Sequence, residues 1–288
     1  MSTLNRDSIT KLKEQRDKIK ATRDKLRHEL AILRNSTAVV TEDHFNLWMK
    51  HVAPKFDLSV PPRDIIGHIT YRSGCPVPES TPRFLHTGYL SMRQHERTLH
   101  AAGYVPRPGT VILDFGCGSA RITRFLGELA PDAQVFGCDI DAAAIEWNIN
   151  HLCASGQYVV SAVQPPLPQT IPMCDLILAI SVFTHLPEPM QNLWLAELRS
   201  RLKPGGYLLA TFHGEAFVRF IPAAQRADFE AKGYAYANLG LTEGLPGYYQ
   251  SAFHSADYVR KHWGSGFAAL HHAPAANGAQ DVAVLVNE

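Results

Sequence analysis

The 288-residue chain is 45% hydrophobic and carries a formal net charge of +1, so it is long and apolar enough to bury a sizeable core. A balance so close to neutral excludes a general electrostatic attraction to nucleic acid or to anionic membranes. The N-terminus is charged and no apolar run reaches the length of a bilayer, so we expect neither a signal peptide nor a membrane span. The five cysteines are scattered without metal-binding spacing, which predicts free thiols, a cytoplasmic protein and no metal site.

The charge is unevenly distributed along the chain. Residues 1–36 hold ten Lys or Arg residues against five Asp or Glu residues, which leaves a net charge of −4 for the rest. Residues 4–35 contain neither Gly nor Pro. Four apolar residues recur there every seven positions: Leu12, Ile19, Leu26 and Leu33. The pattern predicts one long helix that pairs with a copy of itself as a short coiled coil, and hence a homo-oligomer. Packing of this stripe on the chain's own body is one alternative, and binding of the basic face to an anionic membrane or nucleic acid is another.

Residues 37–105 are expected to form a region of helices and loops. A second helix begins after Thr41, whose hydroxyl is a suitable N-cap, and ends at Pro54. Five prolines in residues 58–84 predict a loop. A third helix is expected over residues 85–102, directly before the first strand. We expect residues 37–105 to act as a cap region for the domain that follows.

From residue 106 onward, apolar strand segments alternate with helical segments. Such alternation predicts a mostly parallel sheet with helices on both faces. Strands are expected near 110–114, 134–139, 157–162, 174–180 and 206–212, and a final pair at 267–272 and 281–286. Helices are expected near 121–129, 142–152, 189–202 and 255–263. Residues 214–250 interrupt the alternation with a helix at 223–232 and a Gly/Tyr-rich loop, and we expect this insertion to form a lid over the carboxyl ends of the strands.

The first predicted strand leads into a glycine-rich turn. The run Val-Ile-Leu-Asp-Phe-Gly-Cys-Gly-Ser-Ala-Arg begins at Val111, and its two glycines, Gly116 and Gly118, allow the backbone to approach a ligand closely. The acid at the strand end, Asp114, would repel a diphosphate and attract an ammonium or sulfonium group. The second strand also ends in an acid, Asp139, at the distance at which a βαβ unit contacts ribose hydroxyls. These features predict a nucleotide-type cofactor site.

Together with two later segments, these motifs resemble the class I S-adenosylmethionine-dependent methyltransferases. The later segments are Ser-Val-Phe-Thr-His-Leu from Ser181 and Leu-Lys-Pro-Gly-Gly from Leu202, and the resemblance covers roughly residues 80–288. It implies a Rossmann-like seven-stranded sheet and S-adenosylmethionine as cofactor. One departure is Ala120, which stands where the family has a third glycine. A Rossmann-like domain for another nucleotide is the alternative, but a strict G-x-G-x-x-G is absent.

The resemblance also implies roles for individual residues. Asp114, Gly116, Gly118 and Ser181 would line the methionine part of the cofactor. Asp139 would accept hydrogen bonds from both ribose hydroxyls, Ile140 would lie against the adenine, and Ser161 would meet the adenine edge. Asp141, rather than Asp139, is expected to cap the helix that follows.

Methyl transfer to an alcohol requires an aligned acceptor and is helped by a general base. His185 follows the fourth strand and His213 follows the fifth, so both are candidate bases, with bracing of the next helix as the structural alternative for His185. Further candidates for acceptor contacts are Tyr248, Tyr249 and His254. We therefore expect a methyltransferase that acts on an oxygen of a small molecule such as a natural product or sugar. The alternatives are a protein or RNA methyltransferase and a non-catalytic cofactor-binding scaffold that works through the N-terminal helix.

Overall fold

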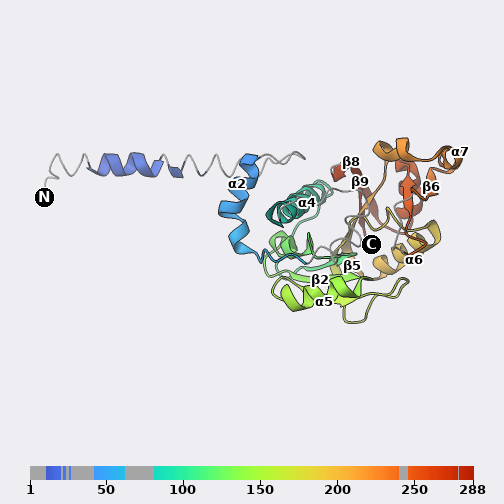
Figure 1. The fold of residues 1–288 in the computed structure, drawn as a ribbon, viewed down its shortest axis with the longest axis horizontal. Helices are drawn as coiled ribbons and strands as arrows, with labels where there is room; N and C mark the ends of the chain where they lie inside the picture. The colour runs from blue at the N-terminus through green and yellow to red at the C-terminus, as the bar shows by residue number, and fades with distance from the viewer. Residues whose placement is uncertain are drawn as a thin grey trace. The chain divides into compact units, whose positions relative to one another are not determined.

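The computed structural model describes residues 11–20, 22, 23, 26, 42–61, 81–239, 246–277 and 279–288 (Figure 1). They belong to two compact units, Met1–Lys55 and Phe56–Glu288, so the boundary lies inside the predicted region 37–105. In the first unit, the described residues between 11 and 26 are helical, as expected. The rest of that predicted helix, Leu33 included, and Thr41 lie outside the described residues. Helix α2 (Glu42–His51) and the short 3-10 helix η1 (Ala53–Lys55) complete this unit.

The second unit is built on a seven-stranded sheet with the order β3-β2-β1-β4-β5-β9-β8. The strands are β1 (Val111–Phe115), β2 (Gln134–Asp139), β3 (Gln157–Val160), β4 (Cys174–Ala179), β5 (Leu202–Phe212), β8 (Ala269–Asn277) and β9 (Gln280–Val286). The first five pair in parallel, whereas β9 runs antiparallel to both β5 and β8. The predicted Rossmann-like, mostly parallel sheet of seven strands is therefore confirmed.

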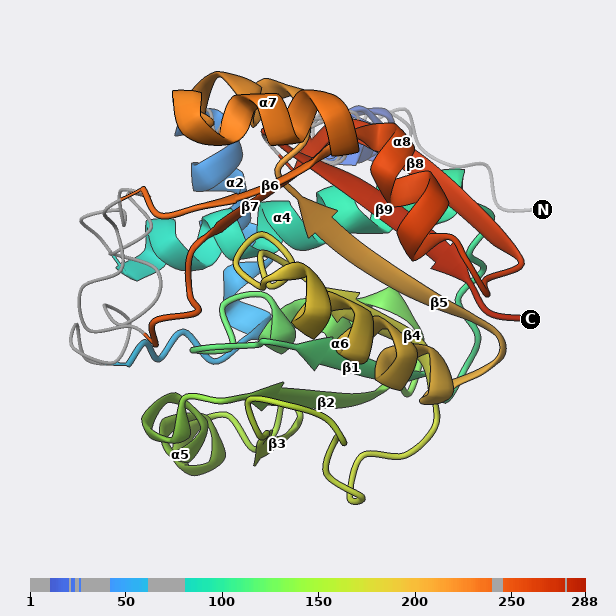
Figure 2. The same cartoon turned by 90° about the vertical axis from the view of Figure 1, so that its right-hand side faces the viewer.

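Helices cover both faces of this sheet. They are α4 (Thr81–Ala101), the 3-10 helix η3 (Thr123–Leu129), α5 (Ala142–His151), α6 (Glu188–Ser200), α8 (Ala256–Tyr258) and the π-helix η5 (Val259–Trp263). Figure 2 shows α6 in front of the sheet and α4 behind it. The expected loop 58–84 extends too far, because α4 already begins at Thr81. Pro82 lies in the first helical turn, where a missing N–H leaves no intrahelical hydrogen bond unmade.

The segment after the glycine turn differs from the prediction. An α-helix was expected over residues 121–129, but the chain forms a turn and then the 3-10 helix η3. Ala120, with a left-handed φ of 54°, belongs to the turn, so a right-handed helix begins only after it. By contrast, α5 begins as predicted, with the Asp141 carboxylate accepting hydrogen bonds from the N–H groups of Ala143 and Ala144.

The insertion after β5 contains more regular structure than expected. The 3-10 helix η4 (Glu215–Phe220) is followed by α7 (Ala223–Lys232), which matches the predicted helix, and then by β6 (Tyr234–Ala237). The prediction of a loop after α7 is wrong at its start, because β6 pairs antiparallel with β7 (Ser251–His254), whereas residues 246–250 form neither helix nor strand. Gly233, with a left-handed φ of 71°, ends α7 and lets the chain reverse into the alternating Tyr-Ala-Tyr-Ala strand.

Main-chain hydrogen bonds hold strand β7 on the carboxyl ends of β4 and β5. The Ala252 N–H donates to the Thr184 carbonyl at 2.8 Å, and the His254 N–H donates to the His213 carbonyl at 2.9 Å. The β6–β7 pair is thus attached to the segments that follow β4 and β5, beside the edge where parallel sheets bind ligands. A lid function for residues 214–250 stays a prediction. The cysteines at 117, 138, 153 and 174 are free thiols. None of the described helices combines the length and the apolarity needed to cross a bilayer.

Candidate active site

The predicted site residues come together at the carboxyl ends of the parallel strands. The strand order places β1 beside β4 at the centre of the sheet, where the connections to β2 and to β5 leave in opposite directions. Such a switch point is the usual ligand-binding position in open parallel sheets. The glycine turn follows β1, and Ser181 to His185 follow β4. The two chain segments that carry the strongest motifs therefore flank one point of the sheet.

The two glycines of the turn differ in what a side chain would meet at their positions. Both have left-handed φ values, 80° at Gly116 and 50° at Gly118. A Cβ on Gly116 would overlap the Val182 side chain, so this glycine permits the packing of the segment after β4 against the turn. A Cβ on Gly118 would meet no described atom within 4 Å. A ligand that lies against the Cα of Gly118 would therefore meet no side chain there, whereas the Gly118 N–H and carbonyl are already bonded to Asp139 and Asn148.

The Asp139 carboxylate is attached directly to the glycine turn. It accepts hydrogen bonds from the Gly118 N–H at 2.7 Å and from the Asp141 N–H at 2.9 Å, each on a different oxygen. Burial raises the pKa of Asp139, and the two N–H donors oppose this shift. A carboxylate offers about four acceptor positions, so Asp139 retains capacity for two further donors such as a pair of hydroxyls.

Asp114 is more enclosed than the sequence indicates. Its side chain is 3% exposed, and it accepts a hydrogen bond from the Thr123 hydroxyl at 2.6 Å. Burial raises the pKa of Asp114 to about 6, with a further contribution from the nearby Asp139 carboxylate, while the Thr123 bond lowers it. The carboxyl therefore anchors the start of η3 and adds negative potential beneath the glycine turn. A direct contact with a ligand stays a prediction.

The remaining predicted cofactor residues lie around the same edge. Ser161 is buried, and its N–H donates to the Asp139 carbonyl at 2.8 Å, which joins the ends of β2 and β3. Ile140 is 40% exposed directly after Asp139, as a residue that lies on a planar ligand would be.

Ser181 occupies a backbone conformation that only its neighbours can maintain. Its φ is 59°, in the left-handed region that is unfavourable for residues other than Gly. The Thr211 hydroxyl accepts from the Ser181 N–H at 2.7 Å, and the Ser181 hydroxyl donates to the Gln280 side-chain oxygen at 3.1 Å. Thr211 and Gln280 escaped the sequence analysis, because they belong to β5 and β9 and carry no motif of their own.

The two candidate bases lie close together and are held in the same tautomer. The rings of His185 and His213 approach edge to face with centroids 6.1 Å apart. The Nδ1 of His185 lies 2.9 Å from the Gln250 carbonyl oxygen, and the Nδ1 of His213 lies 3.1 Å from that of Ala252. A carbonyl oxygen only accepts, so each Nδ1 carries the proton and each Nε2 keeps its lone pair. Burial lowers the pKa of both imidazoles to about 4, so both rings are neutral at pH 7.

The predicted acceptor contacts divide into two groups. Tyr249 stacks on the His185 ring with centroids 4.1 Å apart, so it belongs to the same cluster. His254 is fully buried, and its Nε2 lies 3.0 Å from the side-chain oxygen of Gln191. The Gln191 amide in turn donates to the carbonyls of Phe183 and Leu186. His254 thus braces the segment after β4 from within the core, which is a structural role.

A search of protein families matches residues 113–208 to a family described as a methyltransferase domain. The match runs from β1 into β5 and includes the glycine turn, Asp139 and His185. Residues 113–208 carry a methyltransferase domain. The strand order of the second unit is that of the class I enzymes, which use S-adenosylmethionine as methyl donor.

Curated relatives match over part of their length only. The chain is 28% identical over 104 residues to a tRNA N(3)-methylcytidine methyltransferase of Schizosaccharomyces pombe, covering 34% of this chain and 42% of the relative. It is 29% identical over 121 residues to a malonyl-[acyl-carrier protein] O-methyltransferase of Halalkalibacterium halodurans, covering 40% and 44%. Among solved structures, magnesium protoporphyrin IX methyltransferase of Synechocystis aligns with a TM-score of 0.49 at 18% identity, over 77% of this chain and 94% of that one.

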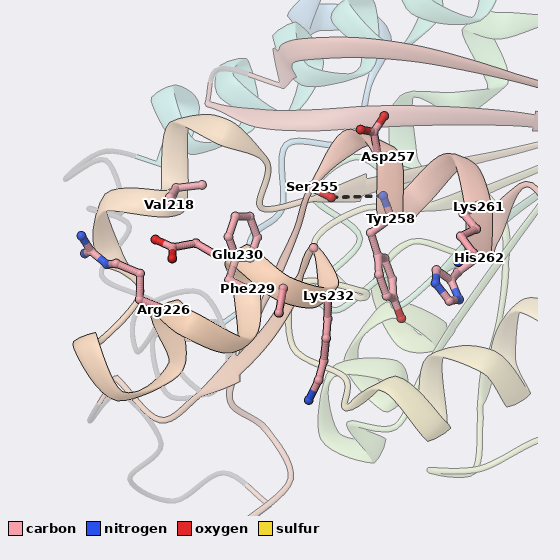
Figure 3. Close-up of a pocket in the computed structure, with 12 residues that line it drawn as sticks. Val218, Arg226, Phe229, Glu230, Lys232, Ser255, Asp257, Tyr258, Lys261 and His262 are labelled. Carbon is pink, nitrogen blue, oxygen red and sulfur yellow. Dashed lines mark hydrogen bonds between the residues drawn. The ribbon is translucent and has the colours of Figure 1, made fainter.

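One further hollow lies outside the methyltransferase site. It has a volume of about 580 Å³ and lies between α7 and the α8–η5 segment (Figure 3). Its lining carries both charge signs, with Arg226, Lys232 and Lys261 alongside Glu230 and Asp257. The lining residues come from the insertion and the helices after it, and none of the predicted site residues is among them. This hollow is therefore separate from the predicted cofactor site at the carboxyl edge of the sheet.

Proposed function

We propose that the methyltransferase domain transfers a methyl group from S-adenosylmethionine to an oxygen atom of a small-molecule acceptor, such as a natural product or a sugar. One arrangement carries the proposal. The glycine turn and Asp139 lie on one side of the β1–β4 switch point, and two neutral imidazoles with unprotonated Nε2 atoms follow β4 and β5.

The residues present fit the methyl donor. Gly118 has open space where a side chain would project, so a ligand can lie against its Cα. Each Asp139 carboxylate oxygen already accepts one hydrogen bond from a main-chain N–H. Each oxygen can accept one more, so the carboxylate can bind two ribose hydroxyls. Asp114 and Asp139 together give the edge a negative potential that suits a ligand with an ammonium and a sulfonium group. When bound, S-adenosylmethionine supplies an activated methyl group whose transfer needs no metal ion.

The protein's own part in such a reaction is alignment and proton removal. An imidazole Nε2 of His185 or His213 accepts the hydroxyl proton of the acceptor, while the insertion excludes water from the edge. Because the carbonyls of Gln250 and Ala252 hold both Nδ1 protons, the rings present their basic nitrogens without a tautomer change. The catalytic role of each histidine is part of the proposal.

The relatives support oxygen as acceptor atom and also provide the main alternative. The malonyl-[acyl-carrier protein] enzyme is an O-methyltransferase, whereas the Schizosaccharomyces pombe enzyme acts on tRNA cytidine. The net charge of +1 and the insertion over the edge favour a small acceptor over tRNA. A non-catalytic scaffold that only binds the cofactor is the other rival.

Calorimetry with the full chain and S-adenosylmethionine tests the proposal. We expect binding by the unmodified protein and at least about tenfold weaker binding by Asp139→Ala, because hydrogen bonds to a charged group contribute roughly 1.5–3 kcal/mol each. Asp141→Ala is the matched control, since Asp141 caps α5 and should affect stability but not affinity. Absence of binding at millimolar cofactor, or equal losses in both variants, would contradict the proposal. Formation of S-adenosylhomocysteine with pooled tRNA, and none with hydroxylated small molecules, would support the RNA alternative.

A further inference from the structure

Arg124 is a buried charge that the reaction described above does not use. Its side chain is 4% exposed at the start of η3, and burial lowers the pKa of the guanidinium to about 10, so it remains charged at pH 7. Its hydrogen bonds all go to main-chain carbonyl oxygens, at 3.0 Å to Ala120, 3.4 Å to Ser119, 3.1 Å to Asp57 and 2.7 Å to Ser59. A planar guanidinium is suited to joining several acceptors at once. Arg124 therefore connects two chain segments that lie more than sixty residues apart.

The first of these segments is the strained end of the glycine turn. Ala120 is fully buried with a φ of 54°, at the position where the resemblance expects glycine. A left-handed conformation is unfavourable for alanine, so neighbouring contacts must maintain it. The Ala120 carbonyl accepts from both the main-chain N–H and the Nε–H of Arg124, at 3.4 and 3.0 Å. Two donors from one residue thus fix the orientation of this peptide group.

The second segment is residues 56–59. The Phe56 ring meets the Phe125 ring edge to face with centroids 4.8 Å apart, and the Asp57 carboxylate accepts from the Ser59 N–H at 2.7 Å. Consecutive side chains of η3, Arg124 and Phe125, therefore hold the 56–59 segment beside the glycine turn. The Arg124 guanidinium donates hydrogen bonds to both the glycine turn and the 56–59 segment, so the positions of these two segments are coupled.

We propose that Arg124 is a positioning residue for cofactor binding, which compensates for the missing third glycine by holding Ala120 in its left-handed conformation and the 56–59 segment against the turn. This inference rests on the proposed function, because it assumes that the glycine turn binds S-adenosylmethionine. It predicts an energetic coupling between residues 120 and 124. Glycine adopts the required conformation without strain, so a chain with Gly at position 120 should depend less on Arg124.

A double-mutant cycle tests the coupling by calorimetry with S-adenosylmethionine and by thermal melting. Arg124→Met should weaken binding roughly tenfold, the factor that a free-energy change of about 1.4 kcal/mol produces. Ala120→Gly alone should bind like the unmodified chain. In the Ala120→Gly background, Arg124→Met should weaken binding by less than about threefold. The matched control is Arg107→Met, which removes an exposed arginine from the turn before β1 and should change nothing.

A second measurement, the rate of trypsin cleavage, reports on the 56–59 segment directly. Trypsin should cut after Lys55 faster in Arg124→Met than in Arg107→Met, because the segment has lost its anchor. If Arg124→Met does not fold, Arg124→Lys replaces it in the same cycle, since Lys keeps the charge but cannot serve four acceptors. Additive effects in both binding and melting, or unchanged trypsin cleavage, would overturn the inference. If the unmodified chain binds no cofactor, the proposed function fails, and the melting cycle and trypsin cleavage still decide the role of Arg124.

Discussion

The buried carboxyl of Asp114 shows how one residue links the glycine turn to the stability of the domain. Its neighbours provide one hydroxyl donor, from Thr123, and a second carboxylate, Asp139, that repels its charge. Ionising Asp114 inside the folded protein is therefore unfavourable. The ionised Asp114 therefore lowers the stability of the folded protein, and it supplies a negative potential beneath the glycine turn.

This cost predicts a pH-dependent effect of Asp114→Asn. Because the pKa of about 6 in the folded state lies above the ordinary value of 3.8, the folded protein binds the Asp114 proton more tightly than the unfolded chain does. Stability from this group is thus lost as pH rises from about 4 to about 6, and the full loss, about 2–3 kcal/mol, persists above that range. Asparagine has no such loss, and its oxygen can still accept from Thr123.

Thermal melting at two pH values measures this effect. The melting temperature of Asp114→Asn relative to the unmodified chain should be higher at pH 7.5 than at pH 4, by several degrees. A difference that is the same at both pH values would mean that Asp114 does not carry the raised pKa.

At the scale of elements, strand β7 is the part that organises the candidate bases. Gln250 and Ala252 are separated by one residue. In an extended chain every second carbonyl points to the same side, so these two carbonyls do as well. Both accept from histidine Nδ1 atoms. The tautomers of His185 and His213 therefore depend on how β7 sits against β4 and β5, which in turn depends on its pairing with β6.

Gly233 provides a test of this dependence. It joins α7 to β6 with a left-handed φ of 71°, and a Cβ there would overlap the Ser255 hydroxyl. Gly233→Ala should destabilise the protein by at least about 1 kcal/mol, because both the conformation and the contact are unfavourable for alanine. Methyl transfer should fall as the β6–β7 pair loosens.

The control for this substitution is Gly247→Ala, since a Cβ at Gly247 would meet no described atom within 4 Å and its φ is not left-handed. Melting curves and turnover of the two variants give the comparison. Equal stability of the two would show that the α7–β6 connection is not under the constraint described here.

At the scale of the whole molecule, the N-terminal helix presents an apolar stripe on its surface. The side chains of Leu12, Ile19 and Leu26 are 55%, 62% and 46% exposed. Lysines stand directly before and after Leu12 and Ile19 in the sequence, at positions 11, 13, 18 and 20. Exposed Leu and Ile at seven-residue spacing are typical of a coiled-coil seam, and burying each contributes about 1.5–3 kcal/mol. Self-association through this helix remains a prediction.

Light scattering tests it with the full chain. We expect a mass of about twice 31.9 kDa, and the monomer mass after deletion of residues 1–36. The double substitution Ile19→Asn and Leu26→Asn should also give the monomer, whereas Lys18→Asn on the same helix should leave the mass unchanged. A monomer mass for the unmodified chain would instead favour the alternatives, in which the stripe meets the chain's own body or another partner.

Local sequence determined the elements and their order in this protein. The alternation of apolar strands and helices predicted the parallel sheet, and the Asp141 cap and the α7 helix were predicted at their observed positions. Such features depend on neighbours along the chain, so a sequence reveals them. The glycine turn and Asp139 were predictable together because they lie within one βαβ unit.

Tertiary structure alone decided how distant segments complete the site. Gly116 is required by Val182, Ser181 is held by Thr211 and Gln280, and Arg124 is bonded to the carbonyls of Asp57 and Ser59. One failed expectation arose in the same way, since pairing with β7 turned the start of a predicted loop into β6. These outcomes depend on contacts between residues far apart in sequence, whose energies no local pattern encodes.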